Sequence, residues 1–199
     1  MPMQIIGTFL KKTNGLVYRR VQKKGAKKGE WTDDLINLLK TANSTTFGVR
    51  HRFVDILKSE DPVKSYQTNV RITDYDEFYE KWLKAGMVGL KDHTWPGRIG
   101  HYALSSGTTG SPSKRIPITK QMIRSFQKSS VGQLAMLHEL NLSNKFYGGH
   151  LLAVGGSSRL TKKVQYLEGD LSGILKKYSS FIVTPLTKPG NKITKESSW

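Results

Sequence analysis

Residues 101–119 read HYALSSGTTGSPSKRIPIT, and this stretch decides our interpretation of the fold. The apolar run from Tyr102 to Leu104 predicts a short strand that ends at Ser105. A loop rich in serine, threonine and glycine follows, up to Lys114. Thr119 is then a suitable cap for the longest helix of the chain, which we expect to continue to about Leu140. Strand, loop and helix in this order predict an α/β fold built from strand-loop-helix units.

The loop itself, residues 105–114, has the composition of a phosphate-binding loop. Glycine lets backbone N–H groups approach an anion closely, hydroxyl groups can donate to phosphate oxygens, and Lys114 adds a mobile positive charge. The Walker A pattern and the dinucleotide fingerprint G-x-G-x-x-G are both absent from this loop. A flexible Ser/Gly/Thr linker is the alternative interpretation. The apolar strand before the loop and the capped helix after it favour the phosphate site.

The loop also resembles a known motif. SSGTT at 105–109, with Lys114 and Ile116-Pro117, is similar to the first ATP motif of the auxin- and jasmonate-conjugating acyl acid amido synthetases and their bacterial members, within the acyl-adenylate-forming superfamily. TTFG at 45–48, VRITDY at 70–75, WPG at 95–97 and GDLSGI at 169–174 resemble other family segments, so the resemblance covers most of residues 32–185. Two positions depart from the pattern. Ser111 stands where plant members usually have glycine, and Ser113 separates the loop proline from its lysine.

The resemblance implies a two-step reaction. A carboxylic acid attacks ATP bound with Mg²⁺ to give an acyl-adenylate, and the amine of an amino acid, or a thiol, then displaces AMP. The residues implied to clamp the phosphates are Ser105, Ser106, Gly107, Thr108, Thr109, Gly110 and Lys114. Phe126, Gln133 and Leu137, on the helix after the loop, are candidates for the acyl pocket, with plain core packing as the alternative. We assign no general base and no metal-ligating residue.

The resemblance also bears on domain organisation. We expect residues 1–199 to be an incomplete N-terminal adenylation domain: a mainly helical lead-in over 1–97, an α/β part with the phosphate loop over 98–185, and a severed tail over 186–199. The family's second nucleotide motif, of the type Y-x-[AS]-S-E, has no counterpart in this sequence. We therefore expect the 199 residues to be inactive by themselves.

Composition narrows the other possibilities. The chain has no cysteine, which excludes disulfides, thiolate metal sites and cysteine nucleophiles. It has no apolar run near the roughly 20 residues that a membrane span needs, and its apolar start precedes Lys11 and Lys12, the reverse of a secretory signal. We expect a cytoplasmic protein without a membrane partner.

The net charge of +17 supports an alternative, a basic nucleic-acid-binding module. Its basic residues concentrate near the start, but the aromatic residues are scattered rather than alternating with them, which disfavours nucleic acid. A third interpretation is a non-catalytic protein that binds a partner through its first helix.

The remaining segments predict further elements. We expect an amphipathic helix over 3–24 that Asn14-Gly15 interrupts, a helix capped by Thr32, and a short strand over 66–72. A third helix, capped by Thr73 or Asp74, should run through Leu83. Further expectations are a buried strand over 150–154, a helix over 170–177 and a strand over 181–184.

Overall fold

The computed structural model describes residues 2–24, 30–107, 112–179, 184–190 and 193–195. The chain divides into two compact units. The terminal unit comprises Met1–Ala26, Lys120–Leu160 and Gly169–Trp199, and the hairpin unit comprises Lys27–Thr119 and Thr161–Glu168. Helices and small sheets occur together, which confirms the α/β class. Within the described residues, no helix has the length and apolar character needed to cross a bilayer.

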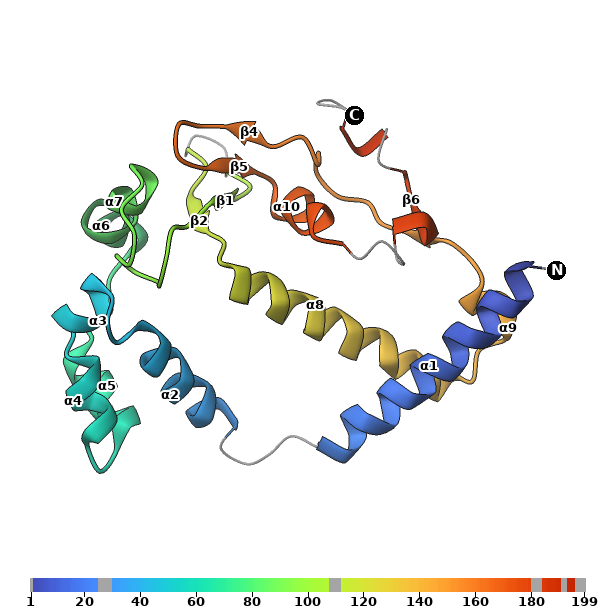
Figure 1. Ribbon diagram of the computed structural model, residues 1–199, viewed down its shortest axis with the longest axis horizontal. Helices are drawn as coiled ribbons and strands as arrows, with labels where there is room; N and C mark the ends of the chain where they lie inside the picture. The colour runs from blue at the N-terminus through green and yellow to red at the C-terminus, as the bar shows by residue number, and fades with distance from the viewer. Residues whose placement is uncertain (1, 25–29, 108–111, 180–183, 191–192, 196–199) are drawn as a thin grey trace. The chain divides into compact units, whose positions relative to one another are not determined.

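The terminal unit contains α1 (Pro2–Lys24), one unbroken helix of 23 residues (Figure 1). The interruption predicted at Asn14-Gly15 is wrong. Asn14 Nδ2 donates to the hydroxyl of Tyr147 at 3.0 Å, and Gly15 is buried beside the ring of His138. Both residues therefore serve as packing positions against η2 (Met136–Leu140) and α9 (Asn144–Tyr147).

The second helix of this unit, α8 (Lys120–Ala135), starts directly after Thr119 as predicted but has only 16 residues. The predicted end is confirmed, because the helix continues to Leu140 as the 3₁₀ turn η2. The expectation that it is the longest helix is wrong, since α1 has 23 residues. The strand predicted over 150–154 shortens to β3 (Leu151–Leu152), which pairs in parallel with β6 (Thr187–Lys188). It is also not buried, since Leu152 is 72% exposed.

The other elements of the terminal unit are short. The helix predicted over 170–177 is confirmed as α10, with Asp170 at its N-cap position. The strand predicted over 181–184 falls mostly outside the described residues, and Thr184 begins a 3₁₀ turn. These elements are α10 (Leu171–Lys177), η3 (Thr184–Leu186) and η4 (Ile193–Lys195).

The hairpin unit begins with helices that surround a small core. Leu39, Ala42, Phe53 and Ile56 are buried at its centre, and Phe47 packs against them. The helical elements are α2 (Glu30–Ala42), α3 (Thr46–Arg50), α4 (Phe53–Lys58), α5 (Pro62–Asn69), α6 (Tyr75–Phe78), the π-helical turn η1 (Tyr79–Leu83) and α7 (Lys84–Met87). The described residues from Glu30 to Met87 are thus mainly helical.

Two predictions for these helices are wrong, and one is confirmed. Thr32 lies inside α2, which already begins at Glu30. The strand over 66–72 is largely helix α5, because the Asp61 carboxylate accepts from Lys64 N at 3.0 Å and Pro62 follows at the first helical turn. Asp74 does cap α6, accepting from Glu77 N at 2.8 Å.

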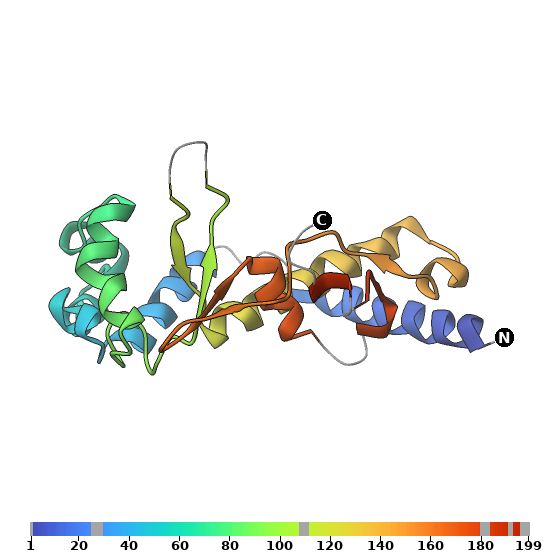
Figure 2. The same ribbon diagram turned by 90° about the horizontal axis from the view of Figure 1, so that it is seen from above.

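The rest of the hairpin unit is a four-stranded sheet in the order β2-β1-β5-β4. Its strands are β1 (His101–Leu104), β2 (Arg115–Pro117), β4 (Thr161–Lys162) and β5 (Leu167–Gly169). β1 and β2 are antiparallel, with Leu104 opposite Arg115 and Tyr102 opposite Pro117 (Figure 2).

The predicted phosphate loop therefore joins two strands, which corrects the expectation of a loop between a strand and a helix. Pro117 disfavours a helical conformation at Ile116 before it, and Ile118 N still donates to His101 O at 2.9 Å. The extended backbone thus persists beyond the loop, and α8 starts only at Lys120. No helix N-terminus follows the loop directly.

Candidate functional site

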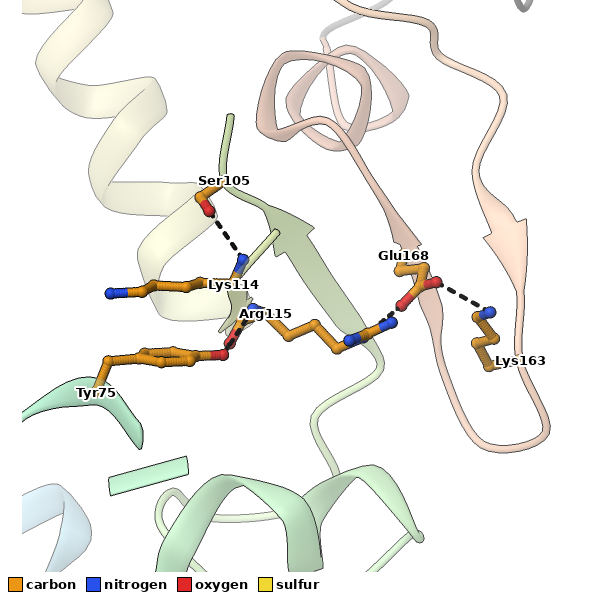
Figure 3. A network of polar contacts seen from close by, with 6 residues as sticks. All are labelled: Tyr75, Ser105, Lys114, Arg115, Lys163 and Glu168. Atoms are coloured by element: carbon orange, nitrogen blue, oxygen red, sulfur yellow. Dashed lines mark hydrogen bonds and ion pairs between the residues drawn. The ribbon is translucent and has the colours of Figure 1, made fainter. Parts of the chain in front are cut away.

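The base of the loop is closed by Ser105 and Lys114. Ser105 N donates to Lys114 O at 2.9 Å, and Lys114 N donates to Ser105 Oγ at 2.9 Å (Figure 3). Ser106, Gly107 and the Lys114 side chain are exposed. The structure thus brings Ser105 and Lys114 together at the base of the loop, while Thr108, Thr109 and Gly110 lie outside the described residues.

The side chain of Lys114 runs over the ring of Tyr75, with Nζ 4.9 Å from the ring centroid (Figure 3). An ammonium at this distance is attracted by the negative face of the aromatic ring. The ammonium group of Lys114 stays exposed to solvent at the end of the loop.

The hydroxyl of Tyr75 contacts the residue next to Lys114. It accepts from Arg115 N at 2.7 Å and donates to Arg115 O at 3.2 Å. Tyr75 therefore contacts two consecutive residues: Lys114, the last residue of the loop, through its ring, and Arg115, the first residue of β2, through its hydroxyl. The sequence analysis did not identify Tyr75 as a site residue, although it lies within the segment 70–75 that resembles the family.

Arg115 has a different environment from Lys114. Its Nε donates to Glu168 Oε2 on β5 at 3.0 Å, and Lys163 Nζ lies 3.0 Å from Glu168 Oε1. The Glu168 side chain is only 7% exposed. Burial would raise the pKa of Glu168, but the hydrogen bonds from Lys163 and Arg115 outweigh it and hold that pKa below its ordinary value. Arg115 and Lys163 therefore stabilise the sheet, and Glu168 is already occupied by two cations.

The sheet also buries Tyr102, whose ring packs edge-on against Tyr166 at 4.7 Å. Its hydroxyl finds no hydrogen-bond partner within the described parts of the chain. Burial first, and then the neighbouring Tyr166 and Tyr79, raise the pKa of Tyr102 to about 12. Tyr102 is therefore neutral at physiological pH and fixes β1 by packing rather than by polar contacts.

The residues predicted for the acyl pocket belong to the other unit. Phe126 and Gln133 are exposed residues of α8, and Leu137 is half-buried in η2. Their spacing of seven and four residues gives them one helix face. Their role in substrate binding stays a prediction.

A comparison with protein families gives one match. A family model described as the GH3 family N-terminal domain matches residues 32–197, which include Tyr75, both arms of the hairpin and Glu168. No curated protein and no solved structure matches the chain.

Proposed function

Because the chain belongs to the GH3 family, the auxin-responsive acyl acid amido synthetases of the adenylate-forming superfamily, we propose that it takes part in the ATP-dependent activation of a carboxylic acid. A carboxylate oxygen attacks the α-phosphorus of ATP, the bond to the bridging oxygen breaks, and pyrophosphate leaves. The amine of an amino acid then attacks the acyl carbon of the acyl-adenylate, and AMP leaves. A thiol acceptor is the alternative for this second step.

The hairpin's part in this reaction is to hold the β- and γ-phosphates. The observation that carries the proposal is the exposed ammonium of Lys114, beside a loop base that Ser105 closes. Ser105 Oγ accepts one backbone hydrogen bond and keeps its own proton to donate. Ser106 and Gly107, which follow Ser105 in the loop, are exposed. The set of residues that we propose to bind the phosphates also includes Thr108, Thr109 and Gly110. Fixed donors of this kind stabilise the charge that develops on a leaving pyrophosphate.

The described residues on this sheet do not offer a ready ligand set for Mg²⁺. The buried carboxylate of Glu168 is held by Arg115 and Lys163, and no group of three or more acidic or histidine side chains in the described residues could hold a metal. We therefore assign no step to protein-bound metal. In the proposal, Mg²⁺ arrives with the phosphates of ATP.

The remaining parts of the proposal rest on the sequence analysis. Phe126, Gln133 and Leu137 would contact the acyl group from one helix face. The reaction would take place in the cytoplasm, without a membrane partner.

Binding of ATP to the 199-residue chain tests the phosphate role. Lys114→Ala should weaken binding by about tenfold to a hundredfold, because a charge-assisted hydrogen bond to phosphate contributes roughly 1.5–3 kcal/mol. Lys162→Ala is the matched control, since it removes an exposed lysine from β4, the opposite outermost strand of the same sheet. Equal affinities for the wild type and both variants would refute the proposal.

Carboxylate-dependent exchange of pyrophosphate into ATP tests the whole reaction. We expect none from these residues by themselves, because the contacts proposed above leave the adenosine unoriented. Robust exchange by the chain alone would contradict this expectation.

A further inference from the structure

Lys114, just before β2, and Arg115, its first residue, are consecutive cations with different environments. Arg115 forms an ion pair with Glu168. The ammonium of Lys114 instead lies over an aromatic ring, and its N–H groups are exposed to solvent. An ammonium on a ring face can still donate to a second group, because the ring occupies only one side of it. Lys114 is thus held in position and remains available to an anion.

The ring beneath Lys114 is itself fixed. Tyr75 is the first residue of α6, directly after the cap Asp74, and its ring stacks on that of Tyr79 at 5.7 Å and 26°. The helix that carries both tyrosines continues through η1, where Trp82 and Leu83 are buried. Tyr75 therefore presents a rigid surface to Lys114.

The hydroxyl of Tyr75 fixes the backbone at the same place. β2 is an outermost strand, and Lys114 turns its backbone C=O and N–H toward Ser105 on the β1 side. Backbone groups alternate along a strand, so the N–H and C=O of Arg115 point away from β1. Tyr75 Oη satisfies both, at 2.7 and 3.2 Å.

We propose that Tyr75 is a positioning residue for Lys114: its hydroxyl fixes the backbone of β2, and its ring holds the lysine ammonium where it meets the phosphates of the nucleotide. This inference rests on the proposed phosphate role of the hairpin. Tyr75 itself contacts neither phosphate nor acid in this proposal, and it acts only through Lys114.

A double-mutant cycle on ATP affinity tests the proposal. Tyr75→Leu should weaken binding by roughly threefold to tenfold, from loss of both the cation–π contact and the backbone contacts. In the Lys114→Ala background the same change should have less than about a twofold effect, because no ammonium remains to be held. Tyr75→Phe keeps the ring and should retain most of the affinity that Tyr75→Leu loses.

The outcomes separate the phosphate role of the hairpin from the positioning role of Tyr75. If Lys114→Ala weakens binding but Tyr75→Leu gives the same loss with or without Lys114, the proposed function stands and the positioning role is wrong. If Lys114→Ala has no effect on ATP binding, the phosphate role itself fails.

A measurement without nucleotide guards against a variant that fails to fold. The ring current of Tyr75 should move the ε-methylene proton resonances of Lys114 upfield of the lysines that contact no aromatic ring, with Lys114→Arg supplying the assignment. Lys81, which lies over the Trp82 ring, is left out of this reference. Tyr75→Phe should keep this shift, whereas Tyr75→Leu should abolish it. An ε-methylene resonance at the position of the other lysines in the wild type would overturn the proposal.

Discussion

The carboxylate of Glu168 forms ion pairs with two basic side chains, those of Arg115 and Lys163. Glu168→Gln removes the charge but keeps the shape, and leaves Arg115 and Lys163 without their carboxylate. We expect the free energy of unfolding to fall by about 1–3 kcal/mol, since the carboxylate is buried but its partners are partly exposed. Urea denaturation measures this. Glu80→Gln, which breaks an exposed pair with Lys84, should change stability far less.

The same residue gives a pH dependence. The folded protein holds the pKa of Glu168 below its ordinary 4.5. A carboxyl with a lowered folded pKa stabilises the fold above its unfolded pKa, and this contribution is lost as the pH falls through the folded value. The difference in stability between wild type and Glu168→Gln should therefore be full at neutral pH and shrink below pH 4.5. A difference that grows toward acid would contradict the lowered pKa.

Removing the hydroxyl group should have opposite effects on the free energy of unfolding at two tyrosines of the hairpin unit. Tyr102 Oη is buried without a partner in the described chain, so Tyr102→Phe should raise the free energy of unfolding by about 1 kcal/mol. Tyr75→Phe removes two hydrogen bonds to Arg115 and should lower it by about 1 kcal/mol. Thermal denaturation of the pair is a direct comparison. Destabilisation by Tyr102→Phe would reveal a partner for that hydroxyl.

At this scale the sequence predicts only part of the site. Local composition and spacing predict Ser105 and Lys114 as phosphate-binding residues, and this role stays a prediction. Tyr75 and Glu168 lie 40 and 53 residues from Arg115, and no local pattern predicts contacts over such separations. The one available signal for Glu168 was that it is the single acidic residue in the segment Tyr166 to Gly169 of a strongly basic chain.

Helix packing in the terminal unit depends on which glycines touch a neighbour. A Cβ at Gly7 of α1 would overlap the carbonyl oxygen of Asn144, whereas one at Gly15 would meet only the movable ring of His138. Gly7→Ala should therefore destabilise the protein by about 1–3 kcal/mol, and Gly15→Ala should be close to neutral. Gly132→Ala in α8, where a Cβ meets nothing within 4 Å, should stabilise by up to about 1 kcal/mol. Urea midpoints rank the three variants, and a different order would show that α1 does not pack on α9 in this way.

Among the elements, the sequence predicted those whose signals are local. β1 has an apolar run, and α6 has its cap at Asp74. The strand expected over 66–72 was wrong because the decisive signal, Asp61-Pro62, lies ahead of the weakly alternating residues. β2 was missed because it is short and its first residue, Arg115, is charged.

Taken whole, the molecule carries a net charge of +17, and much of it lies outside the matched family domain. Lys12, Arg19, Arg20 and Lys23 are exposed residues of α1. Changing these four to Gln should leave ATP affinity within about twofold, because exposed charges contribute little. Any binding of single-stranded DNA should weaken, with a smaller dependence on salt. A tenfold loss of ATP affinity would favour the alternative of a basic nucleic-acid-binding module.

For the whole chain, the sequence correctly predicted the α/β class and the family. The division into two units could not be predicted, because each unit combines segments from distant parts of the sequence. Such an arrangement depends on contacts between segments rather than on local patterns.

The contact between Tyr75 and β2 has one more consequence, for solubility. The outer side of an outermost strand can recruit a strand from another molecule, because its free N–H and C=O groups are a template for further pairing. On β2 both such groups of Arg115 are taken by Tyr75, and Pro117 has no N–H to offer. The tyrosine that holds the proposed phosphate-binding lysine therefore also blocks strand pairing at this edge of the sheet.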